Sequence, residues 1–214
     1  MRRGAILLAG LVAAWPMLFA TQSRAQSDSP VQVGDHWTMD TRDELAGSPM
    51  DTFIQMVTEV SPNEVVVRSS VRGKPGFSLI VFDHSWNRIE DPRTKWTPND
   101  GAGIQMPLVI GKEWRAEFES RNIQQGGAWK GTVLAKVTAQ EKIMTAAGTF
   151  DTFRIEQRLR DVNTADPSRY QEGENVNWYA PQVNHWVRRI MTTLSQKRVV
   201  SKISAELVDF GRKL

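Results

Sequence analysis

The chain has 214 residues, of which 27 are basic and 24 are acidic, and it contains no cysteine. The lack of cysteine excludes disulfide bonds, thiolate chemistry and a lipid-anchored N-terminal cysteine. A chain of this length can bury a substantial hydrophobic core without covalent crosslinks.

The N-terminal segment has the pattern of a secretory signal peptide. Arg2 and Arg3 precede an uncharged apolar run over residues 5–20, and Ser23-Arg24-Ala25 then supplies small residues at the −3 and −1 positions. The run is short for a membrane span of about 20 residues. We therefore expect residues 1–25 to be cleaved, leaving no membrane anchor. A cysteine-free exported protein of this kind fits the bacterial periplasm.

Removal of this segment changes the charge balance of the protein. Residues 1–25 contain three arginines and no acidic residue, so 27 − 3 = 24 basic residues face 24 acidic ones. Nucleic-acid binding needs a basic excess concentrated on one face. We therefore expect no nucleic-acid partner.

Residues 26–33 are predicted to form a flexible lead-in, and from residue 34 onward the chain is rich in β-branched and aromatic residues. Turn residues such as Gly47-Ser48-Pro49 and Ser61-Pro62-Asn63 separate the apolar segments. The strands predicted in this first part cover residues 36–45, 51–60, 64–71, 77–83 and 86–90.

Residues 92–106 lack hydrophobic periodicity and are predicted to be a long connection. Further strands are predicted at 114–118, 129–139, 186–193 and 198–210, and residues 148–162 and 176–189 are expected to be two long strands that face each other. Residues 135–145 and 205–214 are the alternatives for helix. Neither has a capped apolar stripe, so strand is favoured there as well.

The predicted fold class is therefore all-β and mainly antiparallel, in a single domain over residues 34–214. Its halves would be about 34–91 and 107–214, joined by the loop 92–106. Gly34-Asp35-His36-Trp37 is similar to Gly111-Lys112-Glu113-Trp114, and each opens a set of strands. The architecture left open is a curved sheet, a half-barrel or a two-half meander, with or without an internal duplication.

Catalytic and metal-binding motifs are not found in the sequence. The three histidines lie beside tryptophans at His36, His84 and His185, and none forms a spaced pair of the kind that binds zinc. Asp83-His84-Ser85 has the residue types of a hydrolase triad, but consecutive side chains cannot align in hydrogen-bonded order. We therefore predict a protein that is not an enzyme, with no metal and no cofactor.

A carbohydrate-active or hydrolytic enzyme of unrecognised type is kept as the second alternative. Glu172 and Glu174 are a close acidic pair, and two carboxylates can hydrolyse glycosides while tryptophans stack on sugar rings. The pair lies in a polar stretch that is expected to be exposed.

The tryptophans are the residues most suggestive of binding. Either they fill the core, or several line an apolar concavity of a curved sheet that could hold a small ligand. The predicted ligand-binding residues are Trp37, Trp86, Trp114, Trp129, Trp178 and Trp186.

The chain also resembles a secreted proteobacterial family of unknown function, the TapB-like group of periplasmic β proteins. The resemblance is carried by Val33-Gly34-Asp35-x-Trp37, by residues 107–114 (PLVIGKEW), by residues 147–153 (AGTFDTF), and by Trp178-Tyr179-Ala180-Pro181 with Val187-x-Arg189. It implies a periplasmic, mostly β domain, and it supplies no activity and no functional residues.

The function predicted from these features is a non-enzymatic binding or interaction domain of the cell envelope. Its partner would be an envelope protein or a small apolar ligand. The main alternative is a carrier or sensor that holds an apolar ligand or lipid in a Trp-lined concavity. A carrier needs a continuous cavity, whereas an interaction module needs a filled core and an exposed apolar patch. The oligomeric state is left open.

Overall fold

The computed structural model describes residues 30–98 and 101–212, which form twelve β-strands and one short 3-10 helix. The expected signal peptide, residues 1–25, lies outside the described residues. The elements are β1 (Asp35–Asp43), β2 (Ser48–Val60), β3 (Val65–Val71), β4 (Ser78–Phe82), β5 (Arg88–Glu90), β6 (Thr94–Thr97), β7 (Glu113–Asn122), β8 (Ala128–Thr145), β9 (Gly148–Asn163), β10 (Tyr170–Ala180), η1 (Pro181–Val183), β11 (His185–Ser195) and β12 (Arg198–Arg212).

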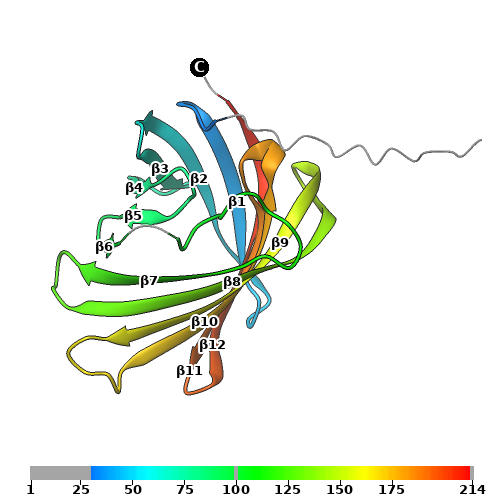
Figure 1. Cartoon of the computed structure of the whole chain (residues 1–214). Coiled ribbons are helices and arrows are strands. Elements are labelled where there is room, and N and C mark those ends of the chain that lie inside the picture. The colour runs from blue at the N-terminus through cyan, green and yellow to red at the C-terminus, as the bar shows by residue number, and fades with distance from the viewer. Residues whose placement is uncertain (1–29, 99–100, 213–214) are drawn as a thin grey trace, which may run out of the picture.

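The sheet closes on itself into a barrel (Figure 1). Each strand pairs antiparallel with the next, and β12 returns to pair with β1, where Asp35 lies opposite Arg212 and Asp43 opposite Ile203. The predicted all-β antiparallel class is confirmed. The predicted open curved sheet or half-barrel is wrong. Closure depends on pairing the two ends of the domain, and the pattern within any one strand does not specify that contact.

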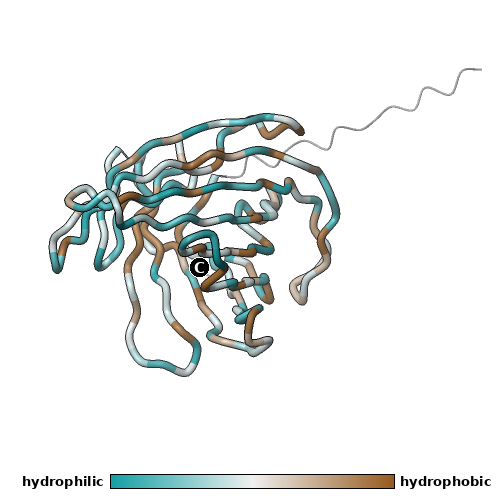
Figure 2. Tube along the Cα trace, turned by 90° about the horizontal axis from the view of Figure 1, so that it is seen from below, coloured by the Kyte–Doolittle hydropathy of each residue, from teal (hydrophilic) through white to brown (hydrophobic). Residues whose placement is uncertain are grey.

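Side chains alternate between the barrel interior and its outer surface, as the strand period of two requires. In β8, Val133, Ala135 and Val137 are 3%, 4% and 0% exposed, whereas Leu134 between them is 46% exposed. Hydrophobic and hydrophilic residues are accordingly interspersed along the strands (Figure 2). This one-sided burial holds the register, because a shift of one residue would turn every apolar side chain outward.

Two segments differ in detail from the sequence prediction. Residues 148–162 do face the next strand, since β9 pairs with β10, but residues 176–189 form a hairpin instead of one strand. Pro181 begins η1 and Asn184 takes a left-handed conformation with φ 48°, which reverses the chain. The predicted connection 92–106 contains β6. Residues 135–145 belong to β8, so the strand favoured there over a helix is confirmed. The division into two halves and their duplication stay predictions.

Two hydrophobic clusters fill much of the interior. The first includes Val57, Val67 and Leu207, and the second includes Val137 and Ile155. Trp86 packs against both clusters and therefore lies between them. None of the described residues forms a helix that is long and apolar enough to cross a membrane.

Candidate ligand-binding cavity

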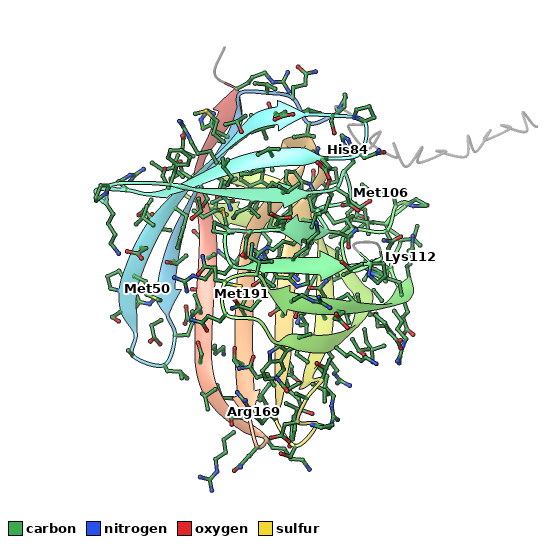
Figure 3. All side chains as sticks on the ribbon, turned by 90° about the vertical axis from the view of Figure 1, so that its left-hand side faces the viewer. Met50, His84, Met106, Lys112, Arg169 and Met191 are labelled. Carbon is green, nitrogen blue, oxygen red and sulfur yellow. The ribbon has the colours of Figure 1, made fainter. Side chains whose placement is uncertain are left out.

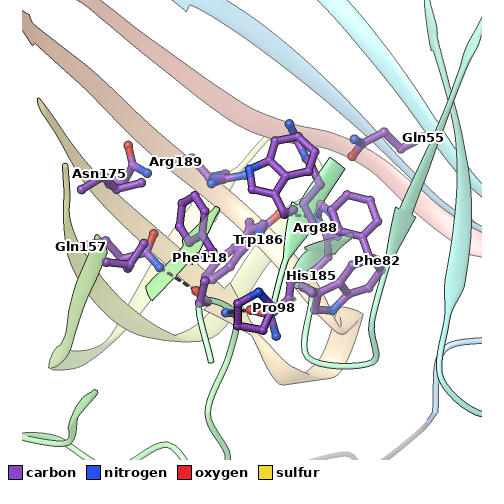
Figure 4. A pocket seen from close by; sticks show the side chains of 17 residues that line it. Gln55, Phe82, Arg88, Pro98, Phe118, Gln157, Asn175, His185, Trp186 and Arg189 are labelled. Carbon is purple, nitrogen blue, oxygen red and sulfur yellow. Dashed lines mark hydrogen bonds between the residues drawn. The ribbon is translucent and has the colours of Figure 1, made fainter. Parts of the chain in front are cut away.

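A cavity of about 270 Å³ opens beside Trp86 (Figure 4). Its lining residues come from nine strands and from the segments between them. Its lining combines aromatic rings, amide side chains and two arginines. The lining residues are Gln55, Phe82, Trp86, Asn87, Arg88, Trp96, Pro98, Ala102, Gly103, Phe118, Val133, Gln157, Leu159, Asn175, His185, Trp186 and Arg189.

The turn between β4 and β5 places Trp86 in this cavity. Asp83 Oδ1 accepts hydrogen bonds from the backbone N–H groups of Ser85 and Asn87, each at 2.8 Å, and Asp83 Oδ2 accepts one from Asn87 Nδ2 at 2.7 Å. Trp86 has a φ of 61°, a conformation that costs a bulky residue of order 1–3 kcal/mol. The hydrogen bonds to Asp83 offset this strain and hold the indole in place.

Asp83 is thus a turn-forming residue. His84 is exposed, and its Nε2 lies 2.8 Å from the Ser61 carbonyl oxygen, toward the outside of the molecule (Figure 3). Asp83 therefore bonds within its own turn, to Ser85 and Asn87, whereas the His84 ring contacts Ser61. This arrangement agrees with the sequence argument that they do not form a hydrolase triad.

The connection after β6 docks onto the same turn. The backbone N–H of Ile104 donates to the Ser85 carbonyl oxygen at 2.7 Å, and the N–H of Gly103 donates to Asn87 Oδ1. Ile104 and Leu108 are both 4% exposed and join the second hydrophobic cluster. The connection therefore forms part of the cavity wall and crosses the barrel beyond β6 (Figure 1).

Gly103 is the residue that allows this close approach. A Cβ at this position would lie 2.0 Å from the Ser85 carbonyl oxygen and 2.8 Å from the Asn87 nitrogen, both backbone atoms. We expect Gly103→Ala to lower the free energy of unfolding by about 1–3 kcal/mol, because the connection must move away from the turn. Urea denaturation measures the change.

The matched control is Gly173→Ala. The nearest atom to a Cβ at Gly173 is the Thr192 carbonyl oxygen at 3.4 Å, which is ordinary contact. This variant should change stability by less than about 1 kcal/mol. Equal effects of the two substitutions would contradict the docking of the connection on the turn.

A chain of amide hydrogen bonds fixes one arginine of the cavity. Arg189 Nε donates to Asn177 Oδ1 at 2.7 Å, Asn177 Nδ2 donates to Gln157 Oε1 at 3.0 Å, and Gln157 Nε2 donates to the Ala102 carbonyl oxygen at 3.4 Å. Asn177 is fully buried. In this series of hydrogen bonds, Asn177 and Gln157 each accept with the amide oxygen or donate with the amide nitrogen as their chemistry allows. The series links the Arg189 guanidinium to the connection after β6.

The two arginines lie against aromatic rings. The Arg189 guanidinium carbon is 5.3 Å from the Trp186 ring centroid, and that of Arg88 is 5.4 Å from the Trp96 centroid. Such cation–π contacts leave the edges of a guanidinium free for other partners. Desolvation by burial lowers the pKa of Arg189 to about 10, and the like charge of Arg88 adds to this shift. The cavity therefore concentrates positive charge.

His185 closes the inner side of the cavity and is 9% exposed. Its ring stacks on Trp37 with centroids 4.5 Å apart and meets Trp86 edge-on at 5.2 Å. Desolvation by burial lowers the pKa of His185 to about 4. The imidazole is therefore neutral at pH 7.

The six predicted tryptophans do not lie in one place. Trp86 and Trp186 line the cavity, and Trp37 contacts Trp86 from the core with ring centroids 5.4 Å apart.

The remaining three lie elsewhere. Trp114 packs against the second hydrophobic cluster, Trp178 donates from Nε1 to Glu141 at 2.6 Å, and Trp129 lines a separate hollow with Arg169 above its ring. They have no part in the cavity wall.

Sequence reasoning missed the most polar part of the cavity. Arg88, Arg189 and Trp96 all line it, and none was among the predicted ligand-binding residues. A signal was present at Arg188-Arg189, since adjacent residues of a strand point to opposite faces and one of two consecutive arginines must face inward. Within residues 30–98 and 101–212, no group of three His, Asp or Glu side chains is arranged to hold a metal ion.

The protein is therefore a closed antiparallel barrel with a cavity lined by aromatic side chains and two arginines. The connection after β6 forms part of the wall of this cavity. No family model matches the chain, and no curated protein matches its sequence. The resemblance to the TapB-like group consequently stays a prediction.

Solved structures share the fold at low sequence identity. A candidate lipoprotein of Parabacteroides distasonis matches with a TM-score of 0.54 and 15% identity over 85% of this chain and 97% of its own. A candidate exported protein of Bacteroides fragilis with a YmcC-like fold gives 0.55 and 14% over 86% and 98%. The hypothetical lipoprotein YmcC of Escherichia coli K12 gives 0.51 and 10% over 86% and 91%. At these identities the likeness concerns the fold alone.

Proposed function

We propose that this protein is a non-enzymatic binding domain of the cell envelope, which holds a small amphipathic ligand inside its barrel. The observation that carries the proposal is the cavity of about 270 Å³, whose wall brings together aromatic side chains from strands far apart in the sequence. Apolar walls with a few fixed polar groups are typical of small-molecule sites.

The placement in the envelope has two supports. Residues 1–25 have the pattern of a secretory signal peptide. The solved structures of similar fold are described as exported proteins or lipoproteins.

An interaction module is the competing function. An exposed sheet edge is the usual site where a β protein adds a partner strand. Among the described strands no whole strand is left at an edge, because β1 and β12 pair with each other, and only short edges stay uncovered, such as residues 113–118 of β7, which β6 does not reach. A ligand inside the barrel therefore accounts for the structure better than a partner strand added to it.

Native mass spectrometry of the protein, purified without detergent from the cells that produce it, tests the proposal. We expect a reproducible added mass in the range of small metabolites, which disappears when the protein is unfolded and refolded. Tryptophan emission should shift at the same step, since Trp86, Trp96 and Trp186 all line the cavity.

A cavity-filling variant supplies the matched comparison. Leu159→Trp places an indole into the cavity, whereas Leu134→Trp adds the same group on the outer surface, where Leu134 is 46% exposed. Only Leu159→Trp should abolish the added mass. Retention of the ligand by both variants would place it outside the cavity and would overturn the proposal.

A further inference from the structure

We propose that the cavity recognises a monocarboxylate with a flat apolar body, and that the Arg189 guanidinium receives its carboxylate group. The inference rests on the function proposed above and goes further by naming the class of ligand and the residue that selects it.

Arg189 is fixed before any ligand arrives. Its Nε donates a hydrogen bond to Asn177 Oδ1 at 2.7 Å, and its guanidinium carbon lies 5.3 Å from the Trp186 ring centroid. These two contacts use one edge and one face of the group. The terminal nitrogens retain their N–H donors, and their fork geometry matches the two oxygens of a carboxylate.

No carboxylate of the described residues lies within ion-pair distance of Arg189. Arg88 has Asp91 at 3.5 Å, but the other described ion pairs leave Arg189 out. The Arg189 residue is half-buried, and a charge that is partly removed from water gains from a partner of opposite charge. One uncompensated positive charge in the cavity favours an occupant with one negative charge.

The other lining residues indicate the chemistry of the uncharged part of the ligand. Phe82, Phe118 and Trp96 offer flat apolar surfaces, and Leu159 and Val133 add aliphatic ones. This lining suits an aromatic or short-chain acid.

Isothermal titration calorimetry with naphthalene-2-carboxylate and 2-naphthamide tests the inference. The two probes share one apolar body and differ in charge at a single group. We expect the carboxylate to bind about 10- to 100-fold more tightly than the amide, as a charge-assisted bidentate contact should provide.

Variants of Arg189 locate the effect. Arg189→Met should bring the two probes to equal affinity, and Arg189→Lys should retain part of the preference, because it keeps the charge and loses the fork. Arg160→Met is the control, since Arg160 is exposed on β9 and stacks on Tyr170 at 5.0 Å. Circular dichroism verifies that each variant is folded.

The outcomes separate the two proposals. Equal binding of acid and amide to the unmodified protein would overturn the carboxylate site and leave the binding cavity standing. Binding of neither probe would overturn the carboxylate site, whereas the binding cavity is decided separately by the added mass in native mass spectrometry. A carboxylate preference that survives Arg189→Met would assign the anion site to another residue and overturn the role of Arg189.

Discussion

Replacing Trp37 with alanine is expected to lower the free energy of unfolding by about 3–5 kcal/mol, the range for a large aromatic side chain removed from a core. Trp37 is 2% exposed, and its Nε1 donates to the Val183 carbonyl oxygen at 3.0 Å, which connects β1 to η1 across the interior. Its ring contacts both Trp86 and His185. Alanine would leave a cavity there and an unpaired carbonyl oxygen.

Urea denaturation at pH 7 followed by circular dichroism measures this loss. Trp37→Phe should cost less than Trp37→Ala, because it retains an aromatic ring in the core and loses the hydrogen bond and only part of the buried volume. Phe77→Ala is the control on the surface, since Phe77 is 63% exposed, and it should change stability by about 0.5 kcal/mol or less. A comparable loss for the Trp37 and Phe77 variants would contradict the burial of Trp37 in the core.

Acidification from pH 7 to below pH 4 is expected to remove about 3 kcal/mol of stability through His185 alone, at 1.36 kcal/mol for each unit of pKa shift. Burial lowers the pKa of His185 from 6.5 to about 4 in the folded protein. Between these values the unfolded chain binds a proton that the folded protein does not. Stability is therefore complete above pH 6.5 and falls as the pH drops toward 4.

His185→Phe isolates this contribution. Phenylalanine retains the stacking on Trp37 and does not titrate in this range. His36 and His84 are present in both proteins, so the comparison isolates His185. The difference in unfolding free energy between the two proteins should change by about 3 kcal/mol between pH 7 and pH 4. A difference that stays constant with pH would show that His185 is not buried as described.

The local structure was largely predictable from the residues. Alternation at Val133, Ala135 and Val137 predicted a strand with one buried face, and all three are buried in β8. The turn chemistry of Ser61-Pro62-Asn63 likewise predicted the link between β2 and β3. These features depend on neighbours close in the chain, so a pattern of a few residues is enough to specify them.

The cavity was not predictable in the same way. Trp86 and Trp114 look alike in sequence, each within or beside a strand, but Trp86 lines the cavity and Trp114 packs against the second hydrophobic cluster. Arg189 was overlooked because a charged residue in a strand is normally solvated. Its side of the strand follows from the local register of the β10–β11 hairpin, in which Asn177 pairs with Arg189. The cavity that it faces is completed by residues far away in the chain, such as Gln55 and Trp96.

The sequence by itself determined the all-β antiparallel class, the strand periodicity and the absence of cysteine chemistry. Only the tertiary structure decided that β1 and β12 close the sheet and that Gly103 lets the connection dock on the Asp83 turn. It also decided that Arg189 donates to Asn177 and lies against the Trp186 ring. The reason is physical, because periodicity records which side of a strand is apolar, whereas closure and cavity shape depend on contacts between residues far apart in the chain.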